Sequence, residues 1–426
     1  MSSAPLRSIE QPGLRREEHA FHTEPVWTKE PSVEVIKTLV IQHLDLTGGE
    51  VPQTSFFAKY ALNKLYAINC TKGRFIFRAT LPVAPTVKTR SEIATLAFVR
   101  EKTTIPVPQI LAYDADLHNE LGFEWIIMER VDARPLQEVW HQISWDKKQQ
   151  VVTQVADFTA QLFRIEMSSI GSLYFANQGD SSATEKFEVG EIVLPTSFRT
   201  SNITLPVNRG PYTTARSCIN AYVTFAQHFA SKLDLNDEDN AKHYEDIQAV
   251  LSGINTVLPT YFPENEKEDT MLSNPDISMW NVLVTDTGDL VSILNWECCA
   301  VLPRAWATQL PRFLCEPDQY EIRDRPEDPS SEEYKDYLGL LARYEKTRLR
   351  AFFLEEMKRI APQWMQIYET GRKKLDLLLT LRCCQGDPTV MLARRWVTAL
   401  AEGREPGGSL EDWITGWRRE EWRTCA

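Results

Sequence analysis

The sequence NPDISMWNVLV occupies residues 274–284, and VSILNWE follows it at residues 291–297. The first stretch places a carboxylate, Asp276, and a carboxamide, Asn281, directly before a short apolar run. The second stretch is another short apolar run, and it ends at the polar residue Asn295. Two such runs joined by a glycine-containing turn are typical of a β-hairpin. We therefore expect a loop bearing two oxygen-containing side chains, then a hairpin with a third at the end of its second strand.

These three side chains are suited to phosphoryl transfer. That reaction needs a group that positions the acceptor hydroxyl and oxygen ligands that hold magnesium against the nucleotide phosphates. Asp276 is our candidate for the first role, and Asn281 and Asn295 are candidates for the second. Turn chemistry is the alternative, because Asp and Asn on loops commonly bond to their own backbone.

The chain before this segment is rich in predicted strands, and the chain around and after it is mainly helical. A glycine-containing turn at residues 71–73 indicates a hairpin. Thr89 and Glu92 have the S/T-x-x-E spacing of a capping box, which predicts a helix that starts near Thr89. The expected strands lie at 56–57, 64–68, 75–79 and 125–128, the hairpin at 283–294, and the helices at 32–44, 151–163, 213–233, 334–357 and 364–381.

The pattern around Asp276 resembles the H-x-D-x-x-x-x-N loop and the I-D-W-E strand end of aminoglycoside phosphotransferases and choline-kinase-like proteins, most closely the large fungal branch of that family. Further segments fit in the same order, namely residues 75–82, 88–95, 105–108, 121–129, 170–175 and 209–212. The resemblance implies an α+β, protein-kinase-like bilobal fold with a small β-rich N-lobe and a large helical C-lobe. The expected division is an N-terminal extension at 1–48, the N-lobe at 49–132 and the C-lobe at 133–426.

The resemblance also assigns roles. Asp276 is similar to the catalytic aspartate, Asn281 to the second metal ligand, and Asn295 stands where the family has the magnesium-binding aspartate. Arg78 stands where the family has the phosphate-binding lysine, and Glu92 resembles its helix partner. The loop over the phosphates would lie at residues 57–66, and the adenine-binding hinge would comprise Met128, Glu129, Arg130 and Val131. The implied ligands are ATP, Mg²⁺ and a small-molecule acceptor of unknown identity.

Several positions depart from the family pattern. Asn274 replaces the loop histidine, and Asn can still donate and accept hydrogen bonds. Asn295 offers one neutral oxygen where magnesium prefers an anionic one, unless Glu297 or the nucleotide compensates. Residues 57–64 contain no glycine, so close approach of backbone to phosphate is harder. Two functions therefore remain open: a small-molecule kinase with a weakened metal site, and an inactive pseudokinase that binds nucleotide or acts as a scaffold.

Some of these residues also have simpler interpretations. Glu92 could serve only as the capping-box acid, and Arg78 could be the solvent-facing residue of its strand. We expect Trp280 and Trp296 to pack in the core or between the lobes; stacking on a substrate is the alternative. The acidic residues between 234 and 239 could attract a cationic substrate, although a solvated loop between helices explains them as well.

Composition excludes several classes of partner. The formal net charge of −12 disfavours nucleic acid, and no apolar stretch is long enough to span a membrane. The N-terminus lacks the basic and apolar segments of a secretory signal. The eight cysteines show no zinc-ligand spacing, and adjacent cysteines make poor disulfides, so we expect reduced, mostly buried thiols. These features predict a cytoplasmic protein, with a mitochondrial location as the alternative.

Overall fold

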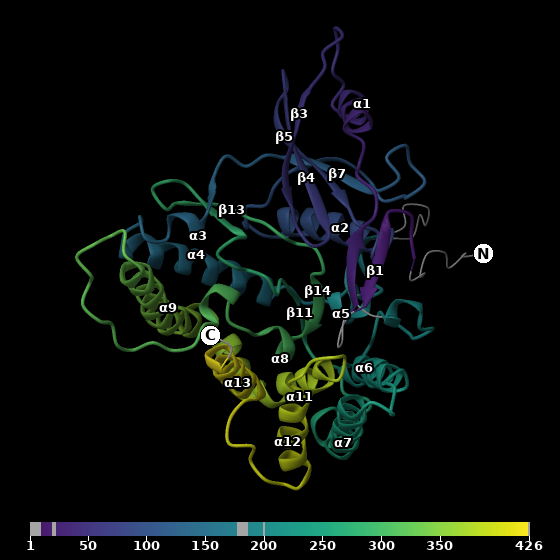
Figure 1. The fold of residues 1–426 in the computed structure, drawn as a ribbon, viewed down its shortest axis with the longest axis vertical. Helices are drawn as coiled ribbons and strands as arrows, with labels where there is room; N and C mark the ends of the chain where they lie inside the picture. Colours follow the sequence, from purple (N-terminus) through teal and green to yellow (C-terminus); the bar gives the residue numbers. More distant parts are fainter. Residues whose placement is uncertain (1–9, 19–22, 177–185, 199–200, 425–426) are drawn as a thin grey trace.

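The computed structural model describes residues 10–18, 23–176, 186–198 and 201–424. Its upper part is an N-lobe built on a five-stranded antiparallel sheet (Figure 1). In spatial order the strands are β3 (Gln53–Lys59), β4 (Asn63–Cys70), β5 (Gly73–Thr80), β7 (Glu124–Glu129) and β6 (Ile110–Asp114). The predicted hairpin between β4 and β5 is confirmed, with Gly73 in a positive-φ conformation that favours glycine.

Two helices accompany this sheet, α1 (Val33–His43) and α2 (Val87–Lys102). The Ser32 side chain caps α1 by accepting a hydrogen bond from the backbone of Val35. The apolar face of α1 packs with Phe77 and Trp125 of the sheet into one buried cluster. This burial explains why a helix of only 11 residues is stable there.

The predicted helix start near Thr89 is confirmed, but Thr89 and Glu92 do not form the expected capping box. The helix begins at Val87, so Thr89 and Glu92 lie inside it, and both are buried. The helix starts earlier because the Glu124 carboxylate accepts a hydrogen bond from the backbone N–H of Thr86, at 2.5 Å. A neighbouring strand therefore supplies the carboxylate that the capping box was expected to provide.

The C-lobe is mainly helical and has two buried clusters. The first contains residues of α4 (Trp145–Arg164) and α9 (Glu332–Ile360), which lie side by side in Figure 1. The second joins α6 (Ala215–Ala230), α7 (Glu238–Tyr261), α11 (Arg372–Cys383), α12 (Val390–Ala401) and α13 (Leu410–Thr424). The α+β, protein-kinase-like bilobal architecture is thereby confirmed.

Two details of the helical region differ from expectation. The helix predicted over residues 364–381 is broken at Gly371 into α10 (Pro362–Thr370) and α11. A Cβ at Gly371 would lie 2.7 Å from the carbonyl oxygen of Ile367, so this junction requires glycine. The loop predicted at the acidic residues 234–239 is too long, because Asp237 caps α7 and the next two residues form its first turn. Acidic residues favour a helix N-terminus.

Short strands join the lobes and frame the central loop. The predicted hairpin consists of β12 (Val282–Val284) and β13 (Leu290–Ile293), and β12 also pairs with β8 (Arg134–Pro135), which directly follows the N-lobe. The remaining elements are β1 (Leu14–Glu18), β2 (Thr23–Trp27), β9 (Ser172–Phe175), β10 (Phe187–Gly190), β11 (Thr270–Ser273), β14 (Ala300–Pro303), α3 (Leu136–Val139), α5 (Pro195–Phe198), α8 (Arg304–Ala307), and the 3-10 turns η1 (Ser201–Thr204) and η2 (Arg312–Leu314). No helix among the described residues is long and apolar enough to cross a bilayer.

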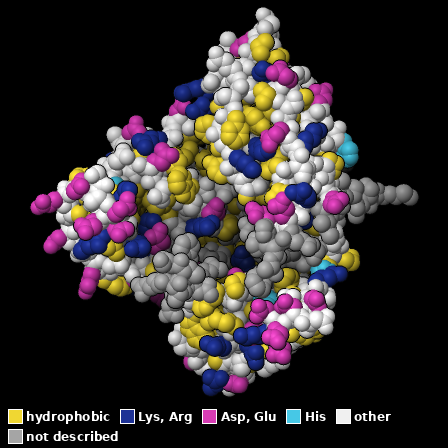
Figure 2. All heavy atoms as spheres, in the orientation of Figure 1, with side chains coloured by type: hydrophobic (Ala, Val, Ile, Leu, Met, Phe, Trp, Pro, Cys, Tyr) yellow, Lys and Arg dark blue, Asp and Glu magenta, His cyan; other side chains and the backbone are white. Residues whose placement is uncertain are grey.

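The surface matches the mixed composition. In Figure 2, acidic and basic side chains are interspersed over the visible face, and a hollow opens near its middle, below the N-lobe. Five of the cysteines are buried, as expected, whereas Cys315 is exposed.

Candidate active site between the lobes

Asp276 is the centre of the candidate site. One of its carboxylate oxygens, Oδ2, accepts hydrogen bonds from the side-chain amides of Asn281, at 2.8 Å, and Asn295, at 2.6 Å. The other oxygen, Oδ1, accepts one from Arg312, at 2.7 Å. The side chain of Asp276 is 29% exposed, so the carboxylate faces solvent while its orientation is fixed. The structure thus brings the three residues predicted from the sequence into direct contact.

Asn274 holds this loop in place. Its carbonyl oxygen accepts the backbone N–H of Asp276, at 2.9 Å, and its amide donates to the backbone oxygen of Asn295, at 3.2 Å. Asn295 has a φ of 60°, in the left-handed region that Asn tolerates better than most residues. Asn274 therefore performs the bridging role that the family pattern gives to histidine.

The side chains present fit a weak magnesium site. The amide nitrogens of Asn281 and Asn295 both face Asp276, so each amide oxygen points away from it and is available as a neutral ligand. No group of three or more His, Cys, Asp and Glu side chains among the described residues could hold a metal ion. Magnesium is commonly bound by one or two protein groups together with substrate phosphates. Asn281 and Asn295 fit that arrangement, with the nucleotide supplying the negative charge.

Arg78 and Glu92 form the expected ion pair. The two Nη atoms of Arg78 donate to the two carboxylate oxygens of Glu92, at 2.7 and 2.5 Å. Burial alone would lower the pKa of Arg78, but the Glu92 carboxylate outweighs it and the pKa is raised. Because Arg78 is only 8% exposed, the alternative of a solvent-facing strand residue is wrong. The pair fixes α2 against the sheet.

A second ion pair links the lobes, with Lys88 buried and Glu297 largely buried, and sequence reasoning missed it. Lys88 on α2 donates to Glu297, which follows β13, at 2.6 Å. Asn63 at the start of β4 donates to the same carboxylate oxygen, at 3.1 Å. Burial would raise the pKa of Glu297, but Lys88 and Arg78 overcome that effect and lower it to about 2. Glu297 is therefore engaged by the N-lobe and does not supply the missing metal carboxylate. Lys88 directly precedes the apparent capping box at residues 89–92, and nothing in the sequence indicated its role.

Glu124 is a third acid, after Glu92 and Glu297, that lies near the buried cations Arg78 and Lys88. Burial raises the pKa of Glu124 to about 7, although the Thr86 N–H and Lys88 oppose the rise. The carboxyl group consequently gains or loses its proton near neutral pH.

The raised pKa of Glu124 predicts a pH-dependent loss of stability. The folded protein keeps this proton up to about pH 7, whereas the unfolded chain releases it near pH 4.5. The resulting stabilisation of the folded state is complete below pH 4.5 and is lost as the pH rises through 7. The total loss in the free energy of unfolding is on the order of 3 kcal/mol. Glu124→Gln should remove this loss, so its free energy of unfolding should exceed that of the wild type at pH 8 and approach it at pH 4.5. Urea unfolding at both pH values measures this, with the exposed Glu120→Gln as control; equal pH profiles for wild type and Glu124→Gln would contradict the assignment.

The hinge residues lie where β7 ends. Met128 and Glu129 belong to β7, and Arg130 and Val131 follow it. The backbone N–H of Glu129 donates to Gln109, and that of Arg130 donates to Arg74. Within the described residues, the Val131 N–H has no such partner, so it is the hinge amide free to meet an adenine base.

The predicted phosphate loop is shorter than expected. Residues 57–66 lie mostly in β3 and β4, and the connection between these strands is only Tyr60–Leu62. Phe57 of β3 is 49% exposed, and its ring centre lies 5.1 Å from the Arg130 guanidinium. This hairpin therefore carries exposed aromatic side chains, Phe57 in β3 and Tyr60 in the turn, where the family pattern has glycine.

The two tryptophans near the site differ in burial. Trp296 is buried, as expected, and its indole N–H donates to the backbone of Ile293. Trp280 is 60% exposed, so the prediction that it packs in the core is wrong. Its neighbours Met279 and Asn281 face inward to the core and to Asp276, which leaves Trp280 directed at solvent.

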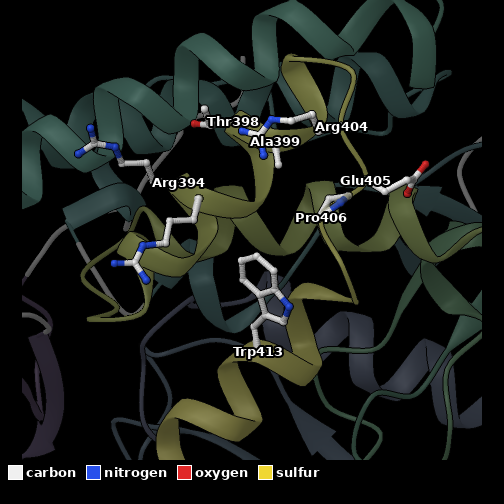
Figure 3. Close-up of a pocket in the computed structure, with 8 residues that line it drawn as sticks. Arg394, Thr398, Ala399, Arg404, Glu405, Pro406 and Trp413 are labelled. Carbon is white, nitrogen blue, oxygen red and sulfur yellow. The ribbon is translucent and has the colours of Figure 1, made fainter.

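A separate cavity of about 390 Å³ lies at the other end of the C-lobe, between α12 and α13. Trp413 faces Thr398 and Arg404 across it (Figure 3). None of the residues predicted for the site lines this cavity, so we place the candidate active site at Asp276 and not here.

The β-rich lobe and the helical lobe give the chain a protein-kinase-like bilobal fold. Residues 54–184 match the family model described as the phosphotransferase enzyme family. The predicted resemblance to aminoglycoside phosphotransferases is thus confirmed for the N-lobe and the beginning of the C-lobe.

Similar proteins include fungal relatives and aminoglycoside phosphotransferases of known structure. A subtelomeric hrmA-associated cluster protein of Aspergillus fumigatus is 23% identical over 326 residues, which cover 65% of this chain and 64% of that protein, so the chain spans less than two thirds of its length. Altered inheritance of mitochondria protein 9 of Meyerozyma guilliermondii is 36% identical over 104 residues, covering 24% of this chain and 17% of that protein. The structure of aminoglycoside phosphotransferase APH(4)-Ia is 13% identical with a TM-score of 0.46, covering 89% of this chain and all of that one.

Proposed function

We propose that the chain transfers the γ-phosphoryl group of ATP to a hydroxyl group of a small molecule, with a weakened metal site. The observation that carries this proposal is the position of Asp276, whose carboxylate is held by Asn281 and Asn295 and faces solvent. The family match over residues 54–184 supports the same reaction class.

In this mechanism Asp276 Oδ1 accepts the proton of the acceptor hydroxyl. The hydroxyl oxygen forms a bond to the γ-phosphorus while the bond to the leaving ADP oxygen breaks, and the proton passes from Asp276 to solvent. Asn281 and Asn295 fix the carboxylate through Oδ2, so that Oδ1 keeps one orientation toward the acceptor. Magnesium, when bound at the two amide oxygens, would neutralise phosphate charge. Val131 would position adenine at the hinge, and Arg78 with Glu92 would hold the N-lobe over the phosphates.

A pseudokinase is the second candidate, and the partners of Glu297 favour it. Since Lys88 and Asn63 engage that carboxylate, Glu297 is not free to replace the family's metal-binding aspartate. A nucleotide could then bind without efficient transfer. The two candidates predict different responses to magnesium.

The metal site is tested by Asn295→Asp. Asp tolerates the positive φ of this position and restores an anionic ligand, so the variant should bind ATP with magnesium about tenfold more tightly or better. Thermal unfolding with ATP, with and without magnesium, measures the gain, because a ligand of the folded state raises the unfolding temperature. Asn220→Asp makes the same chemical change at an exposed position of α6 and should have no effect. If magnesium adds no stabilisation to either the wild type or Asn295→Asp, the kinase proposal fails.

We also propose a cytoplasmic location, with mitochondria as the alternative suggested by the names of some relatives. The net charge of −12 argues against nucleic acid as a partner. Cell fractionation distinguishes the two compartments.

A further inference from the structure

The contact between Arg312 and Asp276 is the least expected feature of the site. Arg312 opens the 3-10 turn η2, and its side chain is 68% exposed. Its Nη1 atom donates to Asp276 Oδ1, which is the oxygen that the acceptor hydroxyl must reach. An arginine therefore stands at the entrance through which the acceptor approaches the base.

The turn that carries Arg312 is rigid. Phe313 and Leu314 are buried, and the backbone N–H of Phe313 donates to Ile277, one residue after Asp276. The carbonyl oxygen of Leu314 accepts a hydrogen bond from Arg350, at 2.7 Å. The backbone of Arg312 is thus fixed relative to Asp276, while its side chain reaches solvent.

Two other arginines, Arg350 and Arg372, have more hydrogen-bond partners than Arg312 does. Arg350 is held by Asp318 and by two backbone carbonyls, and Arg372 is held by Glu411. Among the described residues, the side chain of Arg312 donates a hydrogen bond only to Asp276, through one of its five N–H groups. Its Nε and Nη2 atoms remain available as a fork, which matches the two oxygens of a carboxylate or phosphate.

From these contacts we infer that the acceptor is an anionic small molecule, a hydroxyl compound that carries a carboxylate or phosphate group bound by Arg312. This inference rests on the proposed function and specifies its substrate class. The anionic group draws the guanidinium toward itself, and Asp276 Oδ1 becomes free to meet the hydroxyl. A cationic amino-sugar would instead be repelled by Arg312.

Four small hydroxyl compounds of different charge test the inference. D-glycerate carries a carboxylate, glycerol 3-phosphate a phosphate, glycerol no charge, and ethanolamine a positive charge. Isothermal titration at constant ionic strength measures the affinity of each for the full chain. The titrations are run without nucleotide and again with ADP and magnesium, so that a failure of nucleotide binding counts against the proposed function without removing the test of Arg312.

We expect at least one of the two anions to bind and the neutral and cationic probes to bind about tenfold more weakly or not at all. Arg312→Gln should reduce the affinity for that anion about tenfold or more and leave ADP binding unchanged. Arg312→Lys, which keeps the charge without the fork, should retain an intermediate affinity. Arg343→Gln, at an exposed position of α9, is the matched control and should behave as the wild type.

Several results would overturn the inference. One is the absence of binding of both anions at millimolar concentration, and another is equal affinity for all four probes. Unchanged anion affinity in Arg312→Gln would be a third. Loss of ADP binding in Arg312→Gln would be a fourth, because it would assign Arg312 to the nucleotide phosphates. The relative affinities of glycerate and glycerol 3-phosphate decide between carboxylate and phosphate.

Discussion

Asp276→Ala is expected to reduce ADP release in the presence of an accepted hydroxyl compound by about 10²–10⁴-fold, the usual contribution of a positioned base. The substitution removes the side-chain carboxylate that Asn281 and Asn295 contact, and with it the proposed acceptor of the hydroxyl proton. ATP binding should change much less, because Asp276 acts on the acceptor. Coupled spectrophotometric detection of ADP measures the rate.

Two variants make this prediction specific. Asp276→Asn keeps the shape of the side chain, so a loss of activity there reports lost proton acceptance and not a disturbed loop. Asp286→Asn changes an exposed acid in the turn between β12 and β13 and should leave the rate of ADP release unchanged. A rate in Asp276→Asn equal to that of the wild type would exclude Asp276 as the base.

Lys88→Met is expected to destabilise the fold by about 3–5 kcal/mol, because it leaves the buried Glu297 carboxylate without its cation. The ion pair joins α2 of the N-lobe to the chain that follows β13, so the loss should also loosen the contact between the lobes. Glu297 has a lowered pKa, so the stability that it contributes is present above about pH 4.5 and is lost as the pH falls toward 2. Lys88→Met should weaken this dependence of the free energy of unfolding on pH between about 4.5 and 2.

Chemical denaturation of three variants tests this account of the ion pair. Lys88→Met with Glu297→Gln should be more stable than Lys88→Met alone, since no unpaired charge then remains buried. Lys147→Met breaks an exposed pair with Asp289 and should cost no more than about 1 kcal/mol. Similar small losses for Lys88→Met and Lys147→Met would contradict the account.

The features that the sequence predicted correctly are those with local signals. Short apolar runs on either side of a glycine turn predicted the β4–β5 hairpin, and the N-P-D-x-x-x-x-N pattern with the apolar runs after it predicted the Asp276 loop and the β12–β13 hairpin. These signals lie within a few residues of the elements that they define, so a single chain is enough to read them.

The features that were missed depend on contacts between distant residues. Glu124 satisfies the start of α2 from a neighbouring strand, 38 residues away from Thr86 along the chain. Arg312 reaches Asp276 across 36 residues, and Lys88 reaches Glu297 across 209. A lone Lys or Arg on an otherwise ordinary helix or turn carries no local mark of its partner. The exposure of Trp280 could not be predicted either, because it depends on the inward orientation of its neighbours Met279 and Asn281.

The most direct test of the central claim is the position of a bound nucleotide. A crystal structure with a non-hydrolysable ATP analogue and manganese, whose anomalous signal identifies the metal, would provide it. We predict adenine at Val131, manganese at the amide oxygens of Asn281 and Asn295, and the terminal phosphate beside Asp276. A nucleotide bound in the arginine-lined cavity between α12 and α13, or manganese bound away from both asparagines, would contradict the claim.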